Sequence, residues 1–363
     1  MLRVLHCIYD DIDNPWLGGG GARRVAEVYT RLRHRVNVTI LAGAFPNARA
    51  NETHGMRRRY AGLAHTYAIS RATFSLAASR ALMRMDYDAA VVTFSAYAPI
   101  RIPPRAPVGL FVHHLTGPHA EARWGNVAGS MVRWSETYRL ARARVVATES
   151  DSGAAVLRGI VAPGTPIIVA PNGVSASLLA QPRREGNELL WIGRFDVEQK
   201  GLDILLDAVA TLASTRRDVV LRLVGRGGDE RAVRALIDQR GLGQVVVVEM
   251  GAGPASVAAR LGEARIVVFA SRFEGVSLAF LEAMAAGAPI VATDVGGLRH
   301  VAGEAARLVP ANDAGALASA IGRLLDEAAA RQALGQAARA AAAPYDWDVV
   351  ALRHLEFLEA IAR

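Results

Sequence analysis

Cysteine is scarce in this sequence, and neither a long apolar run nor the pattern of a signal peptide is found in it. Cys7 is the single cysteine among 363 residues, so no internal disulfide can form. It lies in an apolar stretch that predicts a first strand, and we expect it to be a buried small hydrophobic residue. No run of eighteen uncharged apolar residues occurs, and MLRVLHCIYDD lacks the apolar core and cleavage site of a signal peptide. We therefore expect a soluble protein of the cytoplasm.

Lysine is almost missing as well. Of the 42 basic residues 41 are arginine, and the one lysine is Lys200. An ammonium and a guanidinium are not interchangeable where a compact point charge is needed, which draws attention to position 200.

The basic charge is concentrated in one half of the chain. Residues 1–180 hold 21 basic and 11 acidic residues, whereas residues 181–363 hold 21 basic and 23 acidic ones. This asymmetry indicates an anionic partner for the first half, either a phosphorylated substrate, an acidic membrane surface or nucleic acid. A solvated basic face without a partner is the alternative.

Short apolar runs alternate with helical patterns along the whole chain, which predicts parallel strands covered on both faces. The fold class is therefore α/β, with two Rossmann-like doubly wound domains whose strand ends face a central cleft, where such sheets bind ligands. We place the domains at 1–178 and 185–345, joined by the polar stretch 177–188, with a C-terminal helix over 346–363 that can pack back on the first domain. The predicted strands are 2–9, 36–42, 88–94, 108–112, 144–148 and 166–170, then 188–193, 219–225, 245–250, 265–270 and 289–293.

The stretch FEGVSLAFLEAMAAGAPIVATDVGG, 273–297, carries two acids eight positions apart. Its pattern predicts a loop with Glu274, a helix start at Ser277 and Glu282 inside the helix. The N–H groups of 276–278 at a helix start suit a phosphate. A ligand with an anionic middle and a hydroxyl-rich group at each end, such as a nucleoside diphosphate sugar, fits this spacing. The alternative is a pair of solvated carboxylates.

Several motifs together resemble the retaining glycosyltransferases of family 4, which have the GT-B fold and an E-x7-E motif. The match covers most of the chain and comprises GGGGARRVAEVYTRL (18–32), PNGV (171–174), GRFDVEQKG (193–201), LRLVGRG (221–227) and FEGVSLAFLE (273–282).

The resemblance implies a role for each matching residue. Glu274 would lie under the anomeric carbon of the donor sugar, and Glu282 would bind the ribose. Arg194 and Lys200 would neutralise the donor diphosphate. The resemblance also places Gly20, Gly21, Val276, Ser277 and Leu278 beside the diphosphate, and Met250 and Gly251 near the nucleobase. His113 would be the catalytic-site residue that contacts the donor sugar, and it is preferred over its neighbour His114.

The expected activity is the retaining transfer of a hexose-type sugar from a nucleoside diphosphate sugar to an acceptor hydroxyl of a glycan, glycolipid or secondary metabolite. We expect neither a metal nor another cofactor, because Arg194 and Lys200 already balance the diphosphate. A sugar-nucleotide epimerase of the same fold is the alternative, and a basic nucleic-acid-binding protein a weaker one, since no recognition motif occurs. Arg57, Arg58 and Arg59 mark a candidate acceptor site or a contact with the anionic inner membrane face.

Overall fold

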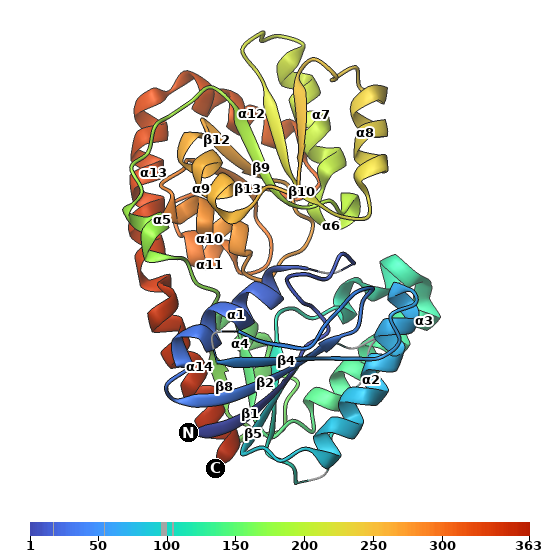
Figure 1. Cartoon of the computed structure of the whole chain (residues 1–363). Helices are drawn as coiled ribbons and strands as arrows, with labels where there is room; N and C mark the ends of the chain where they lie inside the picture. The colour runs from blue at the N-terminus through green and yellow to red at the C-terminus, as the bar shows by residue number, and fades with distance from the viewer. Residues whose placement is uncertain (17, 54, 96–99, 104) are drawn as a thin grey trace. The chain divides into compact units, whose positions relative to one another are not determined.

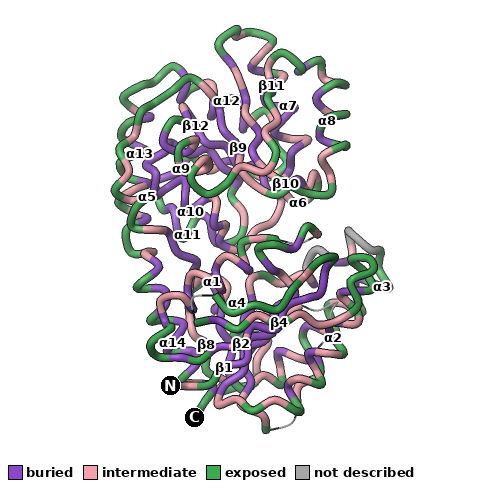
Figure 2. Tube along the Cα trace, viewed as in Figure 1, coloured by how far each residue is buried: buried purple, intermediate pink, exposed green. Residues whose placement is uncertain are grey.

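The computed structural model describes residues 1–363 apart from 17, 54, 96–99 and 104 (Figure 1). It divides into two compact units, one formed by 1–171 together with 347–363 and the other by 172–346. The buried segments follow the strands of each sheet, whereas most turns are exposed (Figure 2). Two parallel-sheet α/β units are the fold that the sequence predicts.

An eight-stranded sheet forms the core of the first unit. Its order is β3-β4-β2-β1-β5-β6-β7-β8, and all its neighbours are parallel except β3 and β4. The strands are β1 (Leu2–Cys7), β2 (Val36–Gly43), β3 (Asn51–Thr53), β4 (Met56–Ala61), β5 (Ala89–Thr93), β6 (Val108–Val112), β7 (Val146–Thr148) and β8 (Ile167–Val169). The pair β3 and β4 was not predicted, because its edge position lets it carry polar residues in place of an apolar run.

Helices cover both faces of this sheet. They are α1 (Gly20–Leu32), α2 (Tyr67–Arg84), α3 (Gly117–Leu140), α4 (Asp151–Arg158) and α14 (Trp347–Ala362). Successive side chains of a strand point to opposite faces. Leu5 and Cys7 accordingly share a core cluster with Phe74 of α2, whereas His6 between them contacts Tyr29 of α1. Cys7 is buried as expected, and burial raises the pKa of its thiol to about 12.

A six-stranded parallel sheet forms the core of the second unit, in the order β11-β10-β9-β12-β13-β14. The strands are β9 (Leu189–Arg194), β10 (Leu221–Arg226), β11 (Val246–Met250), β12 (Ile266–Phe269), β13 (Ile290–Thr293) and β14 (Arg307–Val309). Only β14, three residues long, falls outside the predicted strands among those described here. Its shortness leaves no apolar run from which to recognise it.

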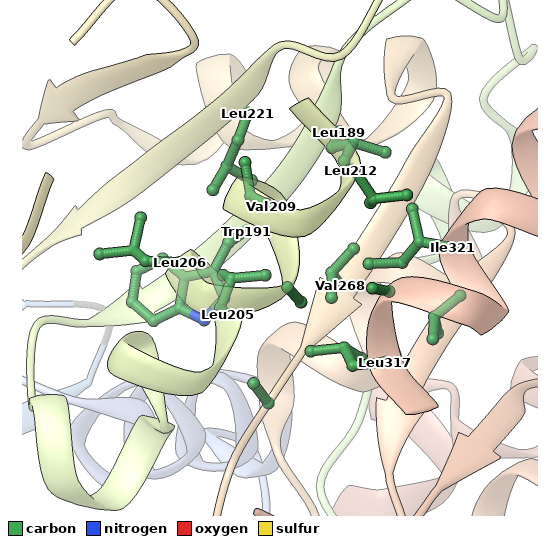
Figure 3. Close-up of a cluster of buried hydrophobic side chains, with 14 of the residues drawn as sticks. Leu189, Trp191, Leu205, Leu206, Val209, Leu212, Leu221, Val268, Leu317 and Ile321 are labelled. Atoms are coloured by element: carbon green, nitrogen blue, oxygen red, sulfur yellow. The ribbon is translucent and has the colours of Figure 1, made fainter. Parts of the chain in front are cut away.

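The helices of the second unit are α5 (Ala176–Ala180), α6 (Val197–Lys200), α7 (Leu202–Ala213), α8 (Glu230–Gln239), α9 (Pro254–Glu263), α10 (Leu278–Ala285), α11 (Leu298–Ala302), α12 (Ala314–Asp326) and α13 (Ala328–Ala342), followed by the 3-10 helix η1 (Ala343–Tyr345). Trp191 packs into the cluster with α7 and α12, which Figure 3 shows in close-up, whereas its neighbour Leu190 packs with α10 on the other face. Several helices begin at a side-chain cap; Asp313, for example, accepts from the Ala316 N–H at 2.8 Å.

The division between the units falls at Pro171 and Asn172, ahead of the predicted linker at 177–188. The cause is local: the Asn172 side chain donates to the Val276 carbonyl at 2.7 Å, and Leu178 joins the core cluster around α10. Residues 172–178 therefore belong to the second unit and not, as predicted, to the first. At the other end of the chain, α14 packs against α1 and is part of the first unit. Among the described residues, no helix is both long and apolar enough to cross a membrane.

Candidate functional site

The predicted residues of the second unit gather where β9 and β12 end. Glu274 lies in the loop between β12 and α10, and its Oε1 accepts from the Ser271 hydroxyl at 2.9 Å and from the Lys200 ammonium. The side chains of Lys200 and Glu274 are only 16% and 9% exposed. The lone lysine of the chain therefore pairs with the first acid of the E-x7-E motif, a contact that the sequence did not predict.

Two glycines let these loops approach each other. Gly201 directly follows Lys200 with φ +59°, and a Cβ there would overlap the Ala270 carbonyl at the end of β12. Gly296 has φ +56°, and a Cβ there would overlap the Glu274 carbonyl. Both positions need the left-handed backbone and the missing side chain that only glycine combines. Gly201 thus lets the Lys200 turn approach the end of β12, and Gly296 lets the loop after β13 approach Glu274.

The start of α10 lies directly after Glu274. Ser277 is the N-cap with an extended backbone, and within the described residues its side chain makes no capping hydrogen bond to the helix. The Val276 carbonyl is held by Asn172, which fixes the entry of the chain into the helix. Leu278 is the first helical residue, and Glu282 lies one turn further on, 7% exposed. The alternative of two solvated carboxylates is therefore wrong, since both acids are largely buried.

Arg194 ends β9 near Lys200 in sequence but is more open to solvent. Its guanidinium donates to the Gln199 side chain at 2.7 Å and lies 3.4 Å from Asp196, and its side chain is 45% exposed. Asp196 is held in turn, because it caps α6 by accepting from the Gln199 N–H at 2.9 Å. Arg194 thus presents a positioned and accessible fork of donors.

Sequence reasoning missed one charged pair that supports this region. Arg272 donates to both carboxylate oxygens of Asp203 at 3.0 and 2.7 Å and to the Asn312 side chain at 2.7 Å. Burial raises the pKa of Asp203, but the hydrogen bonds and the charge of Arg272 outweigh it and hold that pKa below its ordinary value. The pair ties the start of α7 to the segment just ahead of Glu274. The only feature of the sequence that could have indicated this pair is the position of Arg272, two residues before Glu274 of the motif.

Met250 and Gly251, predicted near the nucleobase, end β11 at one edge of the sheet. Met250 is exposed, and Gly251 has φ +71°. The Arg226 guanidinium, at the end of the neighbouring strand β10, donates to the Gly251 carbonyl at 3.3 Å. The structure thus places an exposed side chain and a fixed turn at this edge.

In the first unit the predicted residues lie around the start of α1. Gly20 and Gly21 open that helix after the extended Gly19. A Cβ on Gly21 would lie 3.4 Å from the Asp10 carboxylate and 3.5 Å from His113 Nε2. His113 Nδ1 in turn lies 2.5 Å from Oε1 of the buried Glu149, and His114 beside it is exposed. Asp10 and Glu149 were missed, although each follows the carboxyl end of a strand directly or closely.

The three arginines at 57–59 do not form one cluster. They lie along β4, so Arg57 and Arg59 point to one face and Arg58 to the other. Arg57 pairs with Glu52 of β3 at 3.5 Å, and Arg58 lies 3.9 Å from Asp13. The acceptor site or membrane contact expected at Arg57, Arg58 and Arg59 stays a prediction, and the three side chains would not act in it from one face of the strand.

Comparison with known proteins accounts for both units. A family described as Glycosyltransferase Family 4 matches residues 18–178, and one described as Glycosyl transferases group 1 matches residues 186–327. The chain belongs to glycosyltransferase family 4. This membership gives no support to the epimerase alternative.

Two curated relatives are mycobacterial mannosyltransferases. A phosphatidyl-myo-inositol mannosyltransferase of Mycobacterium leprae is 37% identical over 213 residues, which are 55% of each chain. An MMP alpha-(1->4)-mannosyltransferase of Mycolicibacterium hassiacum is 36% identical over 226 residues, 60% of this chain and 54% of the relative. The chain spans about half the length of the curated relatives it matches.

Solved structures show that the glycosyltransferase fold extends over the full length of the chain. Sucrose-phosphate synthase from Thermosynechococcus elongatus matches with a TM-score of 0.81 and 22% identity over 98% of each chain. The Anabaena protein HepE in complex with UDP and glucose matches with a TM-score of 0.75 and 16% identity, over 99% of this chain and 100% of that one. Both similarities concern the GT-B fold.

Proposed function

We propose that this protein transfers a hexose-type sugar from a nucleoside diphosphate sugar to an acceptor hydroxyl with retention of the anomeric configuration. The observation that carries the proposal is the pairing of Glu274 with Lys200 and Ser271 beside the start of α10, in a member of glycosyltransferase family 4. The similar proteins support the donor class, since two are mannosyltransferases and the solved HepE structure contains UDP and glucose.

The proposed chemistry rests on stabilising the leaving diphosphate. Its charge grows as the bond to the anomeric carbon breaks, and Arg194, Lys200 and the N–H groups at the start of α10 are the donors that meet it. Without donor, Lys200 and Glu274 neutralise each other. The arriving diphosphate shares the Lys200 charge, so the Glu274 carboxylate can accept from a sugar hydroxyl. The acceptor hydroxyl attacks the anomeric carbon on the face that the diphosphate leaves, its proton passes to the departing diphosphate oxygen, and no protein nucleophile is required.

A thermal-shift screen of the full chain against UDP-, GDP- and ADP-sugars tests the donor assignment. A ligand that binds only the folded protein raises its stability with the logarithm of saturation. We expect one nucleotide class to raise the melting temperature, and Glu282→Gln to lose the response. Glu327→Gln is the matched control, because Glu327 is an exposed glutamate of the same unit. No shift with any sugar nucleotide would contradict the donor assignment.

Product stereochemistry tests the retaining outcome separately. The one-bond coupling between C1 and H1 of the transferred sugar, read by NMR of the glycoside product, should indicate the same anomeric configuration as in the donor. An inverted centre would overturn the proposed mechanism even if the donor assignment stands.

We further propose that the acceptor meets the basic first unit, and that it is a glycolipid on an anionic membrane. Support comes from an exposed stripe on α3 that comprises Val127, Met131, Trp134 and Tyr138, spaced so that all four lie on one helix face. Trp134 is 67% exposed and stacks on Tyr138, and the Arg142 guanidinium lies 3.7 Å from the centre of the Tyr138 ring. Exposed aromatic residues flanked by arginine are typical of a membrane interface.

Vesicle flotation tests this part of the proposal. Vesicles of phosphatidylcholine with phosphatidylglycerol should float the protein in low salt, and vesicles of pure phosphatidylcholine should not. The double change Met131→Ser and Trp134→Ser should abolish flotation, whereas Leu352→Ser, which removes an exposed leucine of α14, should not. Absence of flotation in the wild-type protein would favour a soluble acceptor and leave the donor assignment intact.

A further inference from the structure

His113 and Glu149 are brought together by the register of two parallel strands. Val112 of β6 pairs with Thr148 of β7, and His113 and Glu149 are the residues that follow them. The two side chains therefore leave the sheet at the same level, with His113 Nδ1 2.5 Å from Glu149 Oε1. Glu149 is 5% exposed, so water cannot readily replace this partner.

The other edge of the imidazole faces the start of α1. His113 Nε2 lies 3.5 Å from the position of a Cβ on Gly21, and the Asp10 carboxylate lies 3.4 Å from the same position. A Cβ at 21 would therefore lie in ordinary van der Waals contact with this edge of the ring and cover part of it. Because residue 21 is glycine, the Nε2 edge stays open to a ligand at the helix start.

The buried guanidinium of Arg24 compensates the negative charge of the Glu149 carboxylate. Arg24 lies one turn along α1 from Gly21, is 1% exposed and acts on Glu149 through its charge. Its guanidinium lies 4.1 Å from the centre of the Phe111 ring and donates to the Ala170 carbonyl at 3.0 Å. A buried carboxylate is costly unless a cation compensates it. Arg24 therefore favours the ionised form of Glu149, which has no proton to donate and must accept from His113.

A directed chain of hydrogen bonds holds Arg24 in place. Arginine only donates, so His354 Nδ1 of α14, 3.4 Å away, must accept. His354 Nε2–H then donates to the Tyr29 hydroxyl at 3.3 Å, and Tyr29 donates to His6 Nδ1 at 3.0 Å. Burial lowers the pKa of His6 to about 3 and that of His354 well below its ordinary value, so both rings are neutral, as this order requires. The C-terminal helix thus takes part in placing Arg24.

We propose that Glu149 and Arg24 are positioning residues that fix His113 as the tautomer with its proton on Nδ1, so that Nε2 accepts a hydrogen bond from a sugar hydroxyl. The tautomer follows from the contacts of Glu149, whereas the identity of the hydroxyl rests on the proposed function. A histidine with Nε2–H would instead donate to the hydroxyl oxygen, and the hydroxyl proton would then need another acceptor.

Nitrogen NMR of the full chain labelled with ¹⁵N-histidine tests the tautomer without any substrate. Long-range ¹H–¹⁵N correlations at pH 8 distinguish the two neutral forms and the imidazolium, and His113→Gln assigns the signals of His113. We expect a protonated Nδ1 and a bare Nε2 in the wild-type protein. An Nε2–H tautomer or an imidazolium would overturn the proposal.

Two variants test which residues fix the proton. Glu149→Ala removes the group that accepts from Nδ1–H. Arg24→Met leaves Glu149 without its cation, so that Glu149 takes up a proton and donates to Nδ1. Both variants should therefore move the His113 proton to Nε2. Glu136→Gln is the matched control, because Glu136 is a buried glutamate of the same unit bound to the Thr116 and Gly117 N–H groups. Retention of Nδ1–H in Glu149→Ala would show that Glu149 does not position the ring.

Activity provides a second readout. With the sugar nucleotide that shifts the wild-type melting temperature, kcat/KM should fall roughly 10- to 100-fold in Glu149→Ala, which corresponds to the loss of one hydrogen bond to a charged group. A failed donor screen with the expected tautomer would refute the proposed function alone. A successful donor screen with an Nε2–H His113 would refute only this inference.

Discussion

Replacing Gly201 by alanine tests how the Lys200 and Glu274 loops are held together. The left-handed backbone at φ +59° costs a residue with a Cβ about 1–2 kcal/mol. The new Cβ would also overlap the Ala270 carbonyl, and relieving such overpacking costs about 1–3 kcal/mol. We therefore expect Gly201→Ala to lower the free energy of unfolding of the second unit by about 2–5 kcal/mol.

Gly241→Ala is the matched control. Gly241 has φ +66°, but the described residues place no atom within 4 Å of its Cβ position, so only the backbone cost of about 1–2 kcal/mol applies. Hydrogen exchange of amides in β12, followed by mass spectrometry, measures both variants in the full chain. The difference of about 1–3 kcal/mol corresponds to exchange roughly 5- to 150-fold faster in Gly201→Ala than in Gly241→Ala. Equal exchange in the two variants would refute the close approach of Gly201 to β12.

Three further changes probe charge and burial. Lys200→Met should abolish the donor-induced thermal shift, because the diphosphate loses the Lys200 charge and Glu274 loses its ammonium partner and keeps the Ser271 hydroxyl. An unchanged shift would exclude Lys200 from the diphosphate site. His6 is neutral when folded, with its pKa lowered by burial to about 3, but takes up a proton near pH 6.5 when unfolded. The contribution of neutral His6 to the free energy of unfolding is thus complete above pH 6.5 and is lost as the pH falls toward 3. Between pH 6 and 4 the free energy of unfolding, measured with urea, should fall with decreasing pH less steeply in His6→Gln than in the wild-type protein, by about 1.4 kcal/mol per pH unit. An equal pH dependence would mean that folded His6 is protonated. Arg331→Met should cost about 2–3 kcal/mol of unfolding free energy, because Arg331 donates to Glu185 at 2.7 and 2.9 Å from a buried position; a loss below about 0.5 kcal/mol would show that solvent replaces this pair.

Local sequence patterns were enough to predict the architecture and the family. Short β-branched apolar runs such as VGLFV and PIVAT, separated by helical patterns, are typical of strands covered on both faces, so two parallel α/β sheets could be predicted from local patterns. The spacing of Glu274 and Glu282 across a helix start, with GRFDVEQKG in the same half, was also local information. It pointed to the family that the comparison established.

Contacts between distant segments follow from the folded structure and not from any one stretch of sequence. Lys200 and Glu274 are 74 residues apart, and their pairing depends on how Gly201 and Gly296 let separate loops approach. The pairing of His113 with Glu149 depends on the register of β6 and β7. Strand order and register arise from packing over the whole sheet, and no single segment encodes them. The three arginines of β4, adjacent in sequence, likewise separate onto two faces once that segment forms a strand between β3 and β2.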